Sequence, residues 1–297
     1  MEINFKTQKI KPLECPACQK TEVIFWREKN NFKLYKCKNC GLIFVFPQPA
    51  ENETIYSEDY FCGKGKFGYA DYDKDKEAMR PIFEKYLKLM EKYSPEKGNL
   101  LDVGAATGFF LKIAEMRNWK VYGVEISEYA AAEARKKGLN VFTGKLENAY
   151  FQKDSFDAVT FWDVFEHLPQ PEQTLKIVFN LLKPKGLLAI NLPDSGSLYA
   201  KITGKRWHAF VPPEHLFYFN KKNLESLLGR GGFEVLESKR IGKKFTLPYL
   251  IQILSSWLNC PYFLKLLPLI FKLRLDKWPI PINLMDNLFI LARKKLT

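Results

Sequence analysis

The sequence predicts an α/β protein whose core is a parallel sheet of seven strands, preceded by a small four-cysteine module. From residue 97 onward, apolar strand-like runs alternate with amphipathic helical runs. This alternation is typical of a parallel sheet with right-handed crossovers. Two Cys-x-x-Cys pairs lie in the first 48 residues, and a hydrophobic stretch, 243–285, interrupts the pattern before the last strand. The chain of 297 residues is long enough for one large domain and a small one.

The four-cysteine module comes first in the chain. Cys15 and Cys18 form one pair, and Cys37 and Cys40 form the other after 18 intervening residues. This spacing predicts a structural zinc ion with four thiolate ligands, closed to substrate. Strand-like segments at 23–27, 32–36 and 42–46 complete a zinc ribbon over 1–48. Disulfides are the alternative, which the absence of a secretory signal disfavours; Cys62 and Cys260 are expected to be free thiols.

Residues 49–96 are interpreted as a linker and helices that cover a bound cofactor. The first part is rich in Tyr, Gly, Asp and Lys, and Tyr56, Tyr60 and Phe61 could lie over the ligand. Between Pro81 and Tyr93, apolar residues recur at helical spacing. The spacing predicts an amphipathic helix there.

A glycine turn follows the first strand of the sheet domain. The strand 99–103 runs into Gly104-Ala-Ala-Thr-Gly108 and a helix over 107–118, and a second strand, 120–125, ends in Glu125. This layout predicts a nucleotide or nucleoside pocket at the sheet edge. Phe109 stands where a dinucleotide fingerprint needs glycine, and no P-loop is present. Asp102 suits a ligand with an ammonium group, and Glu125 suits ribose hydroxyls.

The remaining elements continue the alternation. Helices are predicted at 128–137 and 171–182, and another starts at the N-cap residue Asn220 and ends near Leu228. The strands that accompany them are expected at 140–143, 156–162, 187–192, 233–240 and 288–294.

Three motifs in this order resemble class I S-adenosylmethionine-dependent methyltransferases: the run 99–110 with Glu125, the run 156–168, and the turn 181–188. Ala106 departs mildly from that family, which prefers glycine there. The resemblance implies a Rossmann-like methyltransferase domain over 97–297, with a seven-stranded, mostly parallel sheet that ends in an antiparallel hairpin. It also implies S-adenosylmethionine as cofactor, bound by Asp102, Gly104, Ala106, Gly108, Glu125, Ile126, Lys145, Leu146 and Asp163.

The acceptor side is expected at the loops after the fourth and fifth strands. Methyl transfer to a hydroxyl or a protonated amine benefits from a general base. Glu166 and His167 follow the fourth strand, and Glu214 and His215 belong to a Pro-Pro-Glu-His-Leu run. That run resembles a methyltransferase subgroup linked to cell-surface sugar or lipid metabolism. These four residues are the candidates for the catalytic base, and His208 lies nearby on the same expected edge.

The last third of the chain is strongly basic. Residues 200–297 carry 17 Lys and Arg against 6 Asp and Glu, in a chain of net charge +13. This skew predicts an anionic partner, and lysines and arginines at 201, 205, 206, 221, 222, 243 and 244 could meet a phosphate. From Phe245 to Leu275 there is no acidic residue. The insertion 243–285 is interpreted either as helices in a membrane interface or as a lid or dimer interface.

The leading hypothesis is therefore a methyltransferase that acts on a small or lipid-linked acceptor, either a sugar or glycan intermediate or a quinone-like molecule, by O- or N-methylation. We expect a cytoplasmic protein, peripheral to the inner face of the membrane if the insertion binds lipid. An RNA base methyltransferase is the first alternative, disfavoured because the residues after strand four, 163–166, lack the Asn/Asp-Pro-Pro-Tyr signature. The second alternative is a non-catalytic, membrane-associated binding protein.

Overall fold

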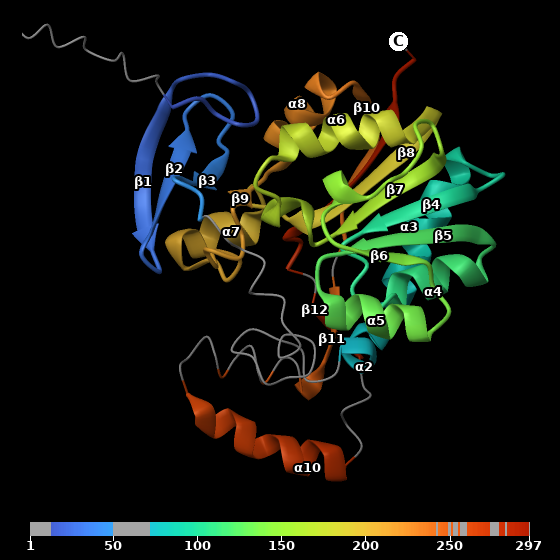
Figure 1. The fold of residues 1–297 in the computed structure, drawn as a ribbon. Helices are drawn as coiled ribbons and strands as arrows, with labels where there is room; N and C mark the ends of the chain where they lie inside the picture. Colours follow the sequence, from blue (N-terminus) through green and yellow to red (C-terminus); the bar gives the residue numbers. More distant parts are fainter. Residues whose placement is uncertain are drawn as a thin grey trace, which may run out of the picture.

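The computed structural model describes residues 13–49, 72–241, 243–248, 251, 255, 260–273, 279–282 and 284–296. The expected cofactor cover at Tyr56, Tyr60 and Phe61, and the expected free thiol Cys62, lie outside these residues. Within the described part, two units are visible in Figure 1: a large domain built on one sheet and a small ribbon at its side.

The large domain contains the predicted seven-stranded sheet, with strand order β10-β13-β8-β7-β4-β5-β6. Its central strands pair in parallel, and β13 runs antiparallel to both β8 and β10. The mostly parallel fold with a terminal antiparallel hairpin is therefore confirmed. The strands are β4 Gly98–Val103, β5 Trp119–Glu125, β6 Val141–Thr143, β7 Phe156–Trp162, β8 Leu182–Pro193, β10 Phe233–Arg240 and β13 Asn287–Lys294.

Helices cover both faces of this sheet (Figure 1). One face carries α3 Arg80–Tyr93, α4 Phe109–Met116 and α5 Glu128–Lys136, and the other carries α6 Pro171–Leu181 and α8 Lys221–Arg230. Each helical layer buries its own apolar cluster against the sheet. The helices confirm the sequence-based positions to within two residues at most ends.

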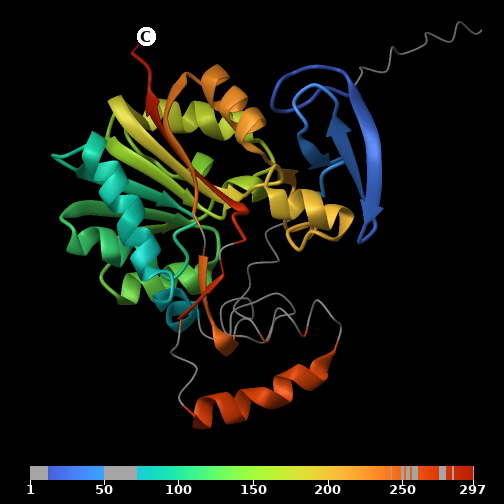
Figure 2. The ribbon, with the colours of Figure 1, turned by 180° about the vertical axis from the view of Figure 1, so that it is seen from behind.

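Helix α3 is part of the packed core of the large domain. This helix, teal in Figure 2, lies across a face of the sheet. Phe83, Tyr86 and Met90 are buried in the same apolar cluster as Phe110 of α4. Tyr86 stacks on Trp162 of β7, with ring centroids 4.9 Å apart. The amphipathic pattern of 81–93 thus reflects burial in the large domain, as is typical of a helix with one apolar face.

The ribbon consists of β1 Val23–Lys29, β2 Phe32–Cys37 and β3 Ile43–Val45. A two-residue strand of the large domain, β9 Phe217–Tyr218, extends this sheet by pairing with β3. Phe44 and Phe217 are both buried in the apolar cluster that also contains α6 and α8. Ribbon and domain therefore share a strand ladder and a core.

The insertion begins and ends in a ladder that the sequence did not predict. Strand β11 Lys243–Thr246 pairs antiparallel with β12 Pro279–Ile282. Between them lie a 3₁₀ helix, η5 Pro261–Leu266, and α10 Leu267–Lys272, drawn as one continuous helix in Figure 1. No helix in the described parts of the chain is long and apolar enough to cross a membrane.

Candidate functional site

The residues predicted to hold a cofactor meet at one edge of the sheet. Gly104 follows β4, Glu125 ends β5, Lys145 and Leu146 follow β6, and Asp163 follows β7. Because these strands are parallel neighbours, their carboxyl ends share that edge. Lys145 is exposed, Leu146 is buried, and Ile126 and Asp163 are half-buried.

The glycine turn has a backbone that other residues cannot adopt without strain. Gly104 and Gly108 have φ angles of 78° and 80°, in the left-handed region. A Cβ on Gly104 would lie 2.4 Å from a methyl carbon of Val164, and one on Gly108 would lie 2.2 Å from Leu139. Both glycines are therefore required by the close packing of this turn. Ala106, with φ 47°, tolerates the left-handed conformation in place of the family glycine.

Two carboxyl groups are buried beside the turn. The Asp102 side chain accepts a hydrogen bond of 2.6 Å from the Thr160 hydroxyl, and burial, with the Glu125 charge, raises its pKa to about 8. Glu125 accepts bonds of 2.7 and 2.9 Å from the backbone N–H groups of Ala106 and Ser127, and burial raises its pKa as well. Buried carboxyls of this kind are stabilised by a cationic or donor-bearing ligand. The donor set thus fits an amino acid ammonium group and a ribose.

Asp163 is held by residues that sequence reasoning missed. The Asn191 amide donates to the Asp163 carboxylate over 2.9 Å, and the Tyr86 hydroxyl donates to the Asn191 carbonyl over 2.8 Å. This relay begins on α3 and crosses the buried Tyr86 ring. Asn191 interrupts an apolar strand, which is a signal for a functional polar group. In the sequence, Tyr86 has the same helical spacing as the other apolar residues of α3, so nothing there distinguished it as a hydrogen-bond donor to the site.

A second missed contact closes the turn from the side of α2 Tyr72–Glu77. The Thr107 hydroxyl donates to the carboxylate of Asp73, which also forms an ion pair with Lys137. Lys137 additionally donates to the Thr107 carbonyl over 2.8 Å. The residues before the large domain's first strand thus fix the glycine turn.

Three of the four candidates for the catalytic base, Glu166, His167 and His215, lie together, and Glu214 contacts this group through its backbone carbonyl. The His167 and His215 rings stand edge to face with centroids 4.7 Å apart, and His167 Nε2 lies 3.7 Å from Glu166 Oε1. Each Nδ1 is 2.8 Å from a backbone carbonyl, that of Glu214 for His167 and that of Ala209 for His215. A carbonyl only accepts, so both Nδ1 atoms donate. The ligand atoms of Glu166, His167 and His215 lie within 4.8 Å of one another, a donor set that a divalent cation could also use.

Burial shifts the pKa values of two of these candidates, His167 and Glu214, in opposite directions. The His167 ring lies inside the protein, and the resulting desolvation lowers its pKa to about 4. Desolvation of the Glu214 carboxyl raises its pKa to about 7. A base works best when its pKa is close to the working pH. Glu214 is therefore the better matched of the two at neutral pH.

His208 and several of the basic residues have contact partners outside the group of base candidates. His208 Nε2 is 3.7 Å from the Asp286 carboxylate, which also accepts from the Trp207 indole over 3.1 Å. Lys222 donates to the Asn39 carbonyl of the ribbon, and Lys221 pairs with Glu225 on α8. The two lysines on α8 thus have partners of their own, whereas the side chains of Lys243 and Lys244 lie outside the described residues.

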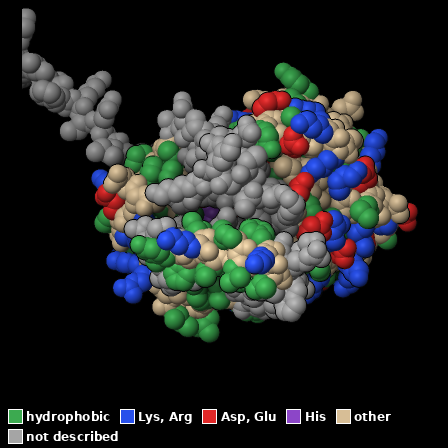
Figure 3. Space-filling model, turned by 90° about the horizontal axis from the view of Figure 1, so that it is seen from below, with side chains coloured by type: hydrophobic (Ala, Val, Ile, Leu, Met, Phe, Trp, Pro, Cys, Tyr) green, Lys and Arg blue, Asp and Glu red, His purple; other side chains and the backbone are tan. Residues whose placement is uncertain are grey.

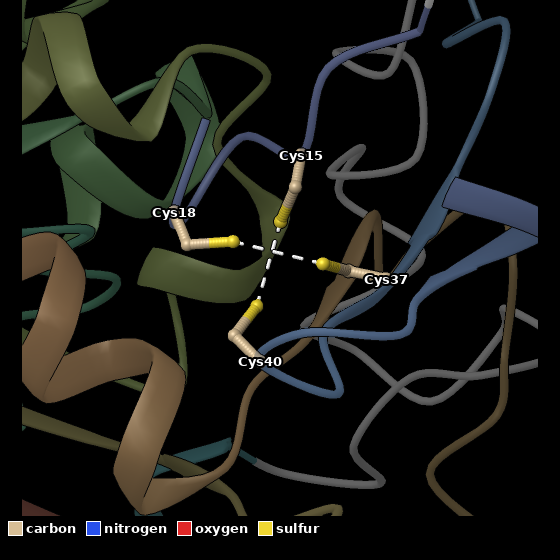
Figure 4. A group of neighbouring side chains, drawn as sticks. All are labelled: Cys15, Cys18, Cys37 and Cys40. Atoms are coloured by element: carbon tan, nitrogen blue, oxygen red, sulfur yellow. Dashed lines mark hydrogen bonds between the residues drawn. The ribbon is translucent and has the colours of Figure 1, made fainter. Parts of the chain in front are cut away.

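The four predicted metal ligands point toward one centre (Figure 4). The Cys15 and Cys40 sulfurs are 3.5 Å apart, and those of Cys18 and Cys37 are 3.6 Å apart. A disulfide would need about 2.05 Å. Tetrahedral zinc with Zn–S bonds of about 2.3 Å places sulfurs about 3.8 Å apart. The cluster therefore fits a tetrahedral ion and does not contain the alternative disulfides.

The cysteine knuckles are docked on the large domain. The amides of Asn220 and Asn223, at the start of α8, donate to the Cys40 carbonyl over 3.4 and 3.5 Å. Arg230, at the end of the same helix, donates to the Ala17 carbonyl. The ribbon residue Asn30 donates to the Pro212 carbonyl over 2.8 Å. Pro212 lies two residues before Glu214, so the ribbon supports the segment that carries two base candidates.

A family model described as a methyltransferase domain matches residues 73–238. The uncharacterized protein MJ1123 of Methanocaldococcus jannaschii is 28% identical over 168 residues, 57% of this chain and 80% of that protein. A ubiquinone biosynthesis O-methyltransferase of Saccharophagus degradans is 27% identical over 173 residues, 54% of this chain and 72% of that protein. The crystal structure of the PH0226 protein from Pyrococcus horikoshii has the same fold, with a TM-score of 0.50, 19% identity, and coverage of 73% of this chain and 91% of that one. The family match begins at α2, which places α2 and α3 inside the large domain.

Proposed function

The chain belongs to the class I S-adenosylmethionine-dependent methyltransferases, and from this premise we propose that it methylates a hydroxyl group of a small or lipid-linked acceptor, with Glu214 as the general base. The observation that carries the proposal is the pairing of two subsites on one sheet edge. Asp102 and Glu125 are buried at the ends of β4 and β5. The cluster of Glu166, His167, Glu214 and His215 lies beyond the end of β7.

The proposed cofactor subsite uses the residues around the glycine turn. Asp102 would bind the ammonium group and Glu125 the ribose hydroxyls. Gly104, Ala106 and Gly108 would let the backbone approach the ligand. The other proposed cofactor-binding residues are Ile126, Lys145, Leu146 and Asp163. When bound, the cofactor supplies an activated methyl group and its leaving group. The protein has to position the acceptor and remove its proton.

The proposed base is Glu214 because its carboxyl titrates near neutral pH. Its ionised form takes the proton of the acceptor hydroxyl as the oxygen attacks the methyl carbon. The backbone carbonyl of the same residue accepts a hydrogen bond from His167 Nδ1. His167 and His215 would orient the acceptor hydroxyl through their Nε2 atoms, and the backbone carbonyls at Nδ1 would hold the two rings. These roles assign positioning to the histidines and proton transfer to Glu214.

The proposed acceptor class is supported by the names of the relatives and by the positive charge of the segment after β8. Relatives include ubiquinone biosynthesis O-methyltransferases and a 2-methyl-6-phytyl-1,4-hydroquinone methyltransferase of Oryza sativa. Methyl transfer to a hydroxyl of a quinone precursor or of a sugar benefits from a general base. Lys201, Lys205 and Arg206 are exposed in the segment that follows β8, and Ala209 of the same segment bonds His215, so these cations would favour an anionic head on the acceptor.

The test has two parts. Titration calorimetry with S-adenosylmethionine should give saturable binding that Glu125→Gln weakens and Glu128→Gln, an exposed neighbour on α5, does not. Tritiated cofactor mixed with cell extract should then label the lipid or glycan fraction. Absence of cofactor binding would refute the cofactor subsite, and label confined to RNA or protein would refute the acceptor class.

For the ribbon we propose a zinc ion bound by Cys15, Cys18, Cys37 and Cys40. The support is the sulfur spacing and the convergence of all four side chains. Four thiolates leave no open position on zinc, so the ion would stabilise the ribbon without taking part in methyl transfer. Metal analysis of the purified protein should find about one zinc per chain, and Cys18→Ser together with Cys37→Ser should abolish it.

A further inference from the structure

The insertion presents an unusually apolar surface between β11 and β12. In the helical run 261–273, large hydrophobic side chains are exposed by 40–70%. The exposed ones are Tyr262, Leu264, Leu266, Leu269, Phe271 and Leu273. By contrast, Phe263 and Leu267 are half-buried and Ile270 is 7% exposed. This run thus has an inner apolar side that packs on the protein and an outer apolar side that does not.

The outer side has helical regularity. Leu266, Leu269 and Leu273, at the start, middle and end of α10, are spaced by three and four residues, which places them on one stripe. A helix of a soluble protein normally buries its apolar stripe and exposes polar residues. Here the stripe with the greatest exposure is apolar. Solvent exposure of so many large side chains calls for a partner surface.

The charges of this run are all positive. Lys265 and Lys272 are exposed and lie seven residues apart, on one flank of the stripe, and no acidic residue occurs between 261 and 273. Lys265 Nζ lies 4.8 Å above the Tyr262 ring. Figure 3 shows the face on which α10 lies, and hydrophobic side chains gather there with basic ones among them. Figures 1 and 2 both show α10 set apart from the sheet.

We propose that the run 261–273 docks this protein on a membrane surface that contains anionic lipids. An interfacial helix needs an apolar side that enters the acyl boundary and cations that meet anionic headgroups. The exposed stripe supplies the first, and Lys265 and Lys272 supply the second. A second copy of the chain is a poorer partner. In a two-fold contact, like-charged lysines would face each other with no acidic residue of the run to pair with them.

The proposal is tested with the full-length protein and sedimenting vesicles. Vesicles of phosphatidylcholine alone are compared with vesicles that contain one quarter phosphatidylglycerol. We expect binding to the anionic vesicles that falls with added salt. Lys265→Gln with Lys272→Gln should weaken it roughly 25-fold, since each basic residue near an anionic surface contributes about a five-fold effect. Leu266→Asp with Leu269→Asp should abolish it.

Met116→Asp is the matched control, because Met116 is 74% exposed at the end of α4 and lies outside the insertion. It should leave vesicle binding unchanged. Equal binding of all variants, or no binding of the wild type, would overturn the proposal, as would a dimer in light scattering that the Leu266→Asp, Leu269→Asp variant disrupts. The assay contains neither cofactor nor acceptor, so its result does not depend on the proposed methyl transfer.

Discussion

The Glu214 carboxyl decides whether the proposed acceptor site contains a base at neutral pH. Burial holds its pKa at about 7, above the usual value near 4.5. The ionised fraction therefore grows tenfold per pH unit below about 7 and levels off above it. We expect kcat to follow that rise. Glu214→Gln should lower kcat by about 10²–10⁴-fold and flatten this part of the pH profile.

The control for this experiment is Glu225→Gln, a carboxylate of α8 that pairs with Lys221. It should reproduce the wild-type profile. If Glu214→Gln keeps the rise in kcat near pH 7, another group is the base. His215→Asn and Glu166→Gln would then be measured in the same way to identify it.

The raised pKa of Asp102 predicts that this carboxyl releases a proton when the cofactor binds. Its folded pKa of about 8 lies above the value for an unfolded chain, so the carboxyl is mostly protonated at pH 7 in the ligand-free protein. A bound ammonium group favours the charged form and lowers this pKa. The carboxyl should then lose its proton to the buffer. The binding enthalpy measured at pH 7 should therefore differ between phosphate and Tris buffers. Divided by the difference in ionisation enthalpy of the two buffers, it should correspond to a released fraction of a proton to one proton, and Asp102→Asn should remove the difference.

The same pKa has a consequence for stability. Because the folded pKa is raised, the contribution of Asp102 to stability is fully present below about pH 4 and is lost as the pH rises toward about 8. In the absence of ligand, Asp102→Asn should therefore be stabilising relative to wild type at pH 8 and not at pH 4. Chemical denaturation at the two pH values checks this, and an equal effect at both would contradict the assignment.

Helix α8 connects the cysteine ribbon to the sheet domain. Asn220 and Asn223 form a reciprocal cap at its start, and both amides also donate to the Cys40 carbonyl. Asn223 is completely buried. We expect Asn223→Ala to lower the free energy of unfolding by about 1–3 kcal/mol, since it removes a cap and leaves a buried carbonyl without one of its donors. Urea denaturation measures this; Lys221→Ala, at an exposed position of the same turn, should cost less than about 0.5 kcal/mol.

The elements that sequence predicted well are those with local signals. The central strands and their helices carry long periodic patterns, and the glycine turn and the two cysteine pairs have spacings with a direct physical meaning. Strand β9 has no such signal, because two residues become a strand only through their pairing with β3. Strand β12 contains Pro279 and Pro281, which disfavour a strand in any local prediction. Both depend on contacts between segments far apart in the sequence.

The residues of the candidate site likewise fall into those with a local sequence signal and those that depend on contacts between distant segments. Asp102, Glu125 and the histidines were predicted because reactive or polar residues followed predicted strands. The relay from Tyr86 to Asn191 to Asp163 was missed because its first member lies more than 70 residues before its last and serves as a core residue as well. The choice of Glu214 over His167 as base also required the structure, since burial raises the pKa of Glu214 and lowers that of His167.

In the whole molecule, the ribbon lies next to the segment that carries the proposed base candidates Glu214 and His215. Asn30 bonds the Pro212 carbonyl, the Val45 N–H donates to the Leu216 carbonyl over 2.9 Å, and β3 pairs with β9. These bonds bracket Glu214 and His215. The Leu216 N–H in turn donates to the Glu166 carbonyl over 3.0 Å. Loss of the ribbon fold would therefore release the backbone that positions the proposed base cluster, whereas the glycine turn rests on β4, β5 and α2.

This arrangement predicts an asymmetric effect of zinc removal. Small modules built on four cysteine ligands fold with their metal, so a strong zinc chelator should unfold the ribbon and free the segment 212–218. We expect turnover to fall by about 10²-fold, the effect of misplacing a catalytic group by about 1 Å. The dissociation constant for S-adenosylmethionine should change less than about threefold, because no proposed cofactor residue lies in that segment. Calorimetry and turnover on the same chelated sample separate the two, and readded zinc should restore activity. An equal loss of both would show instead that the ribbon supports the fold of the entire domain.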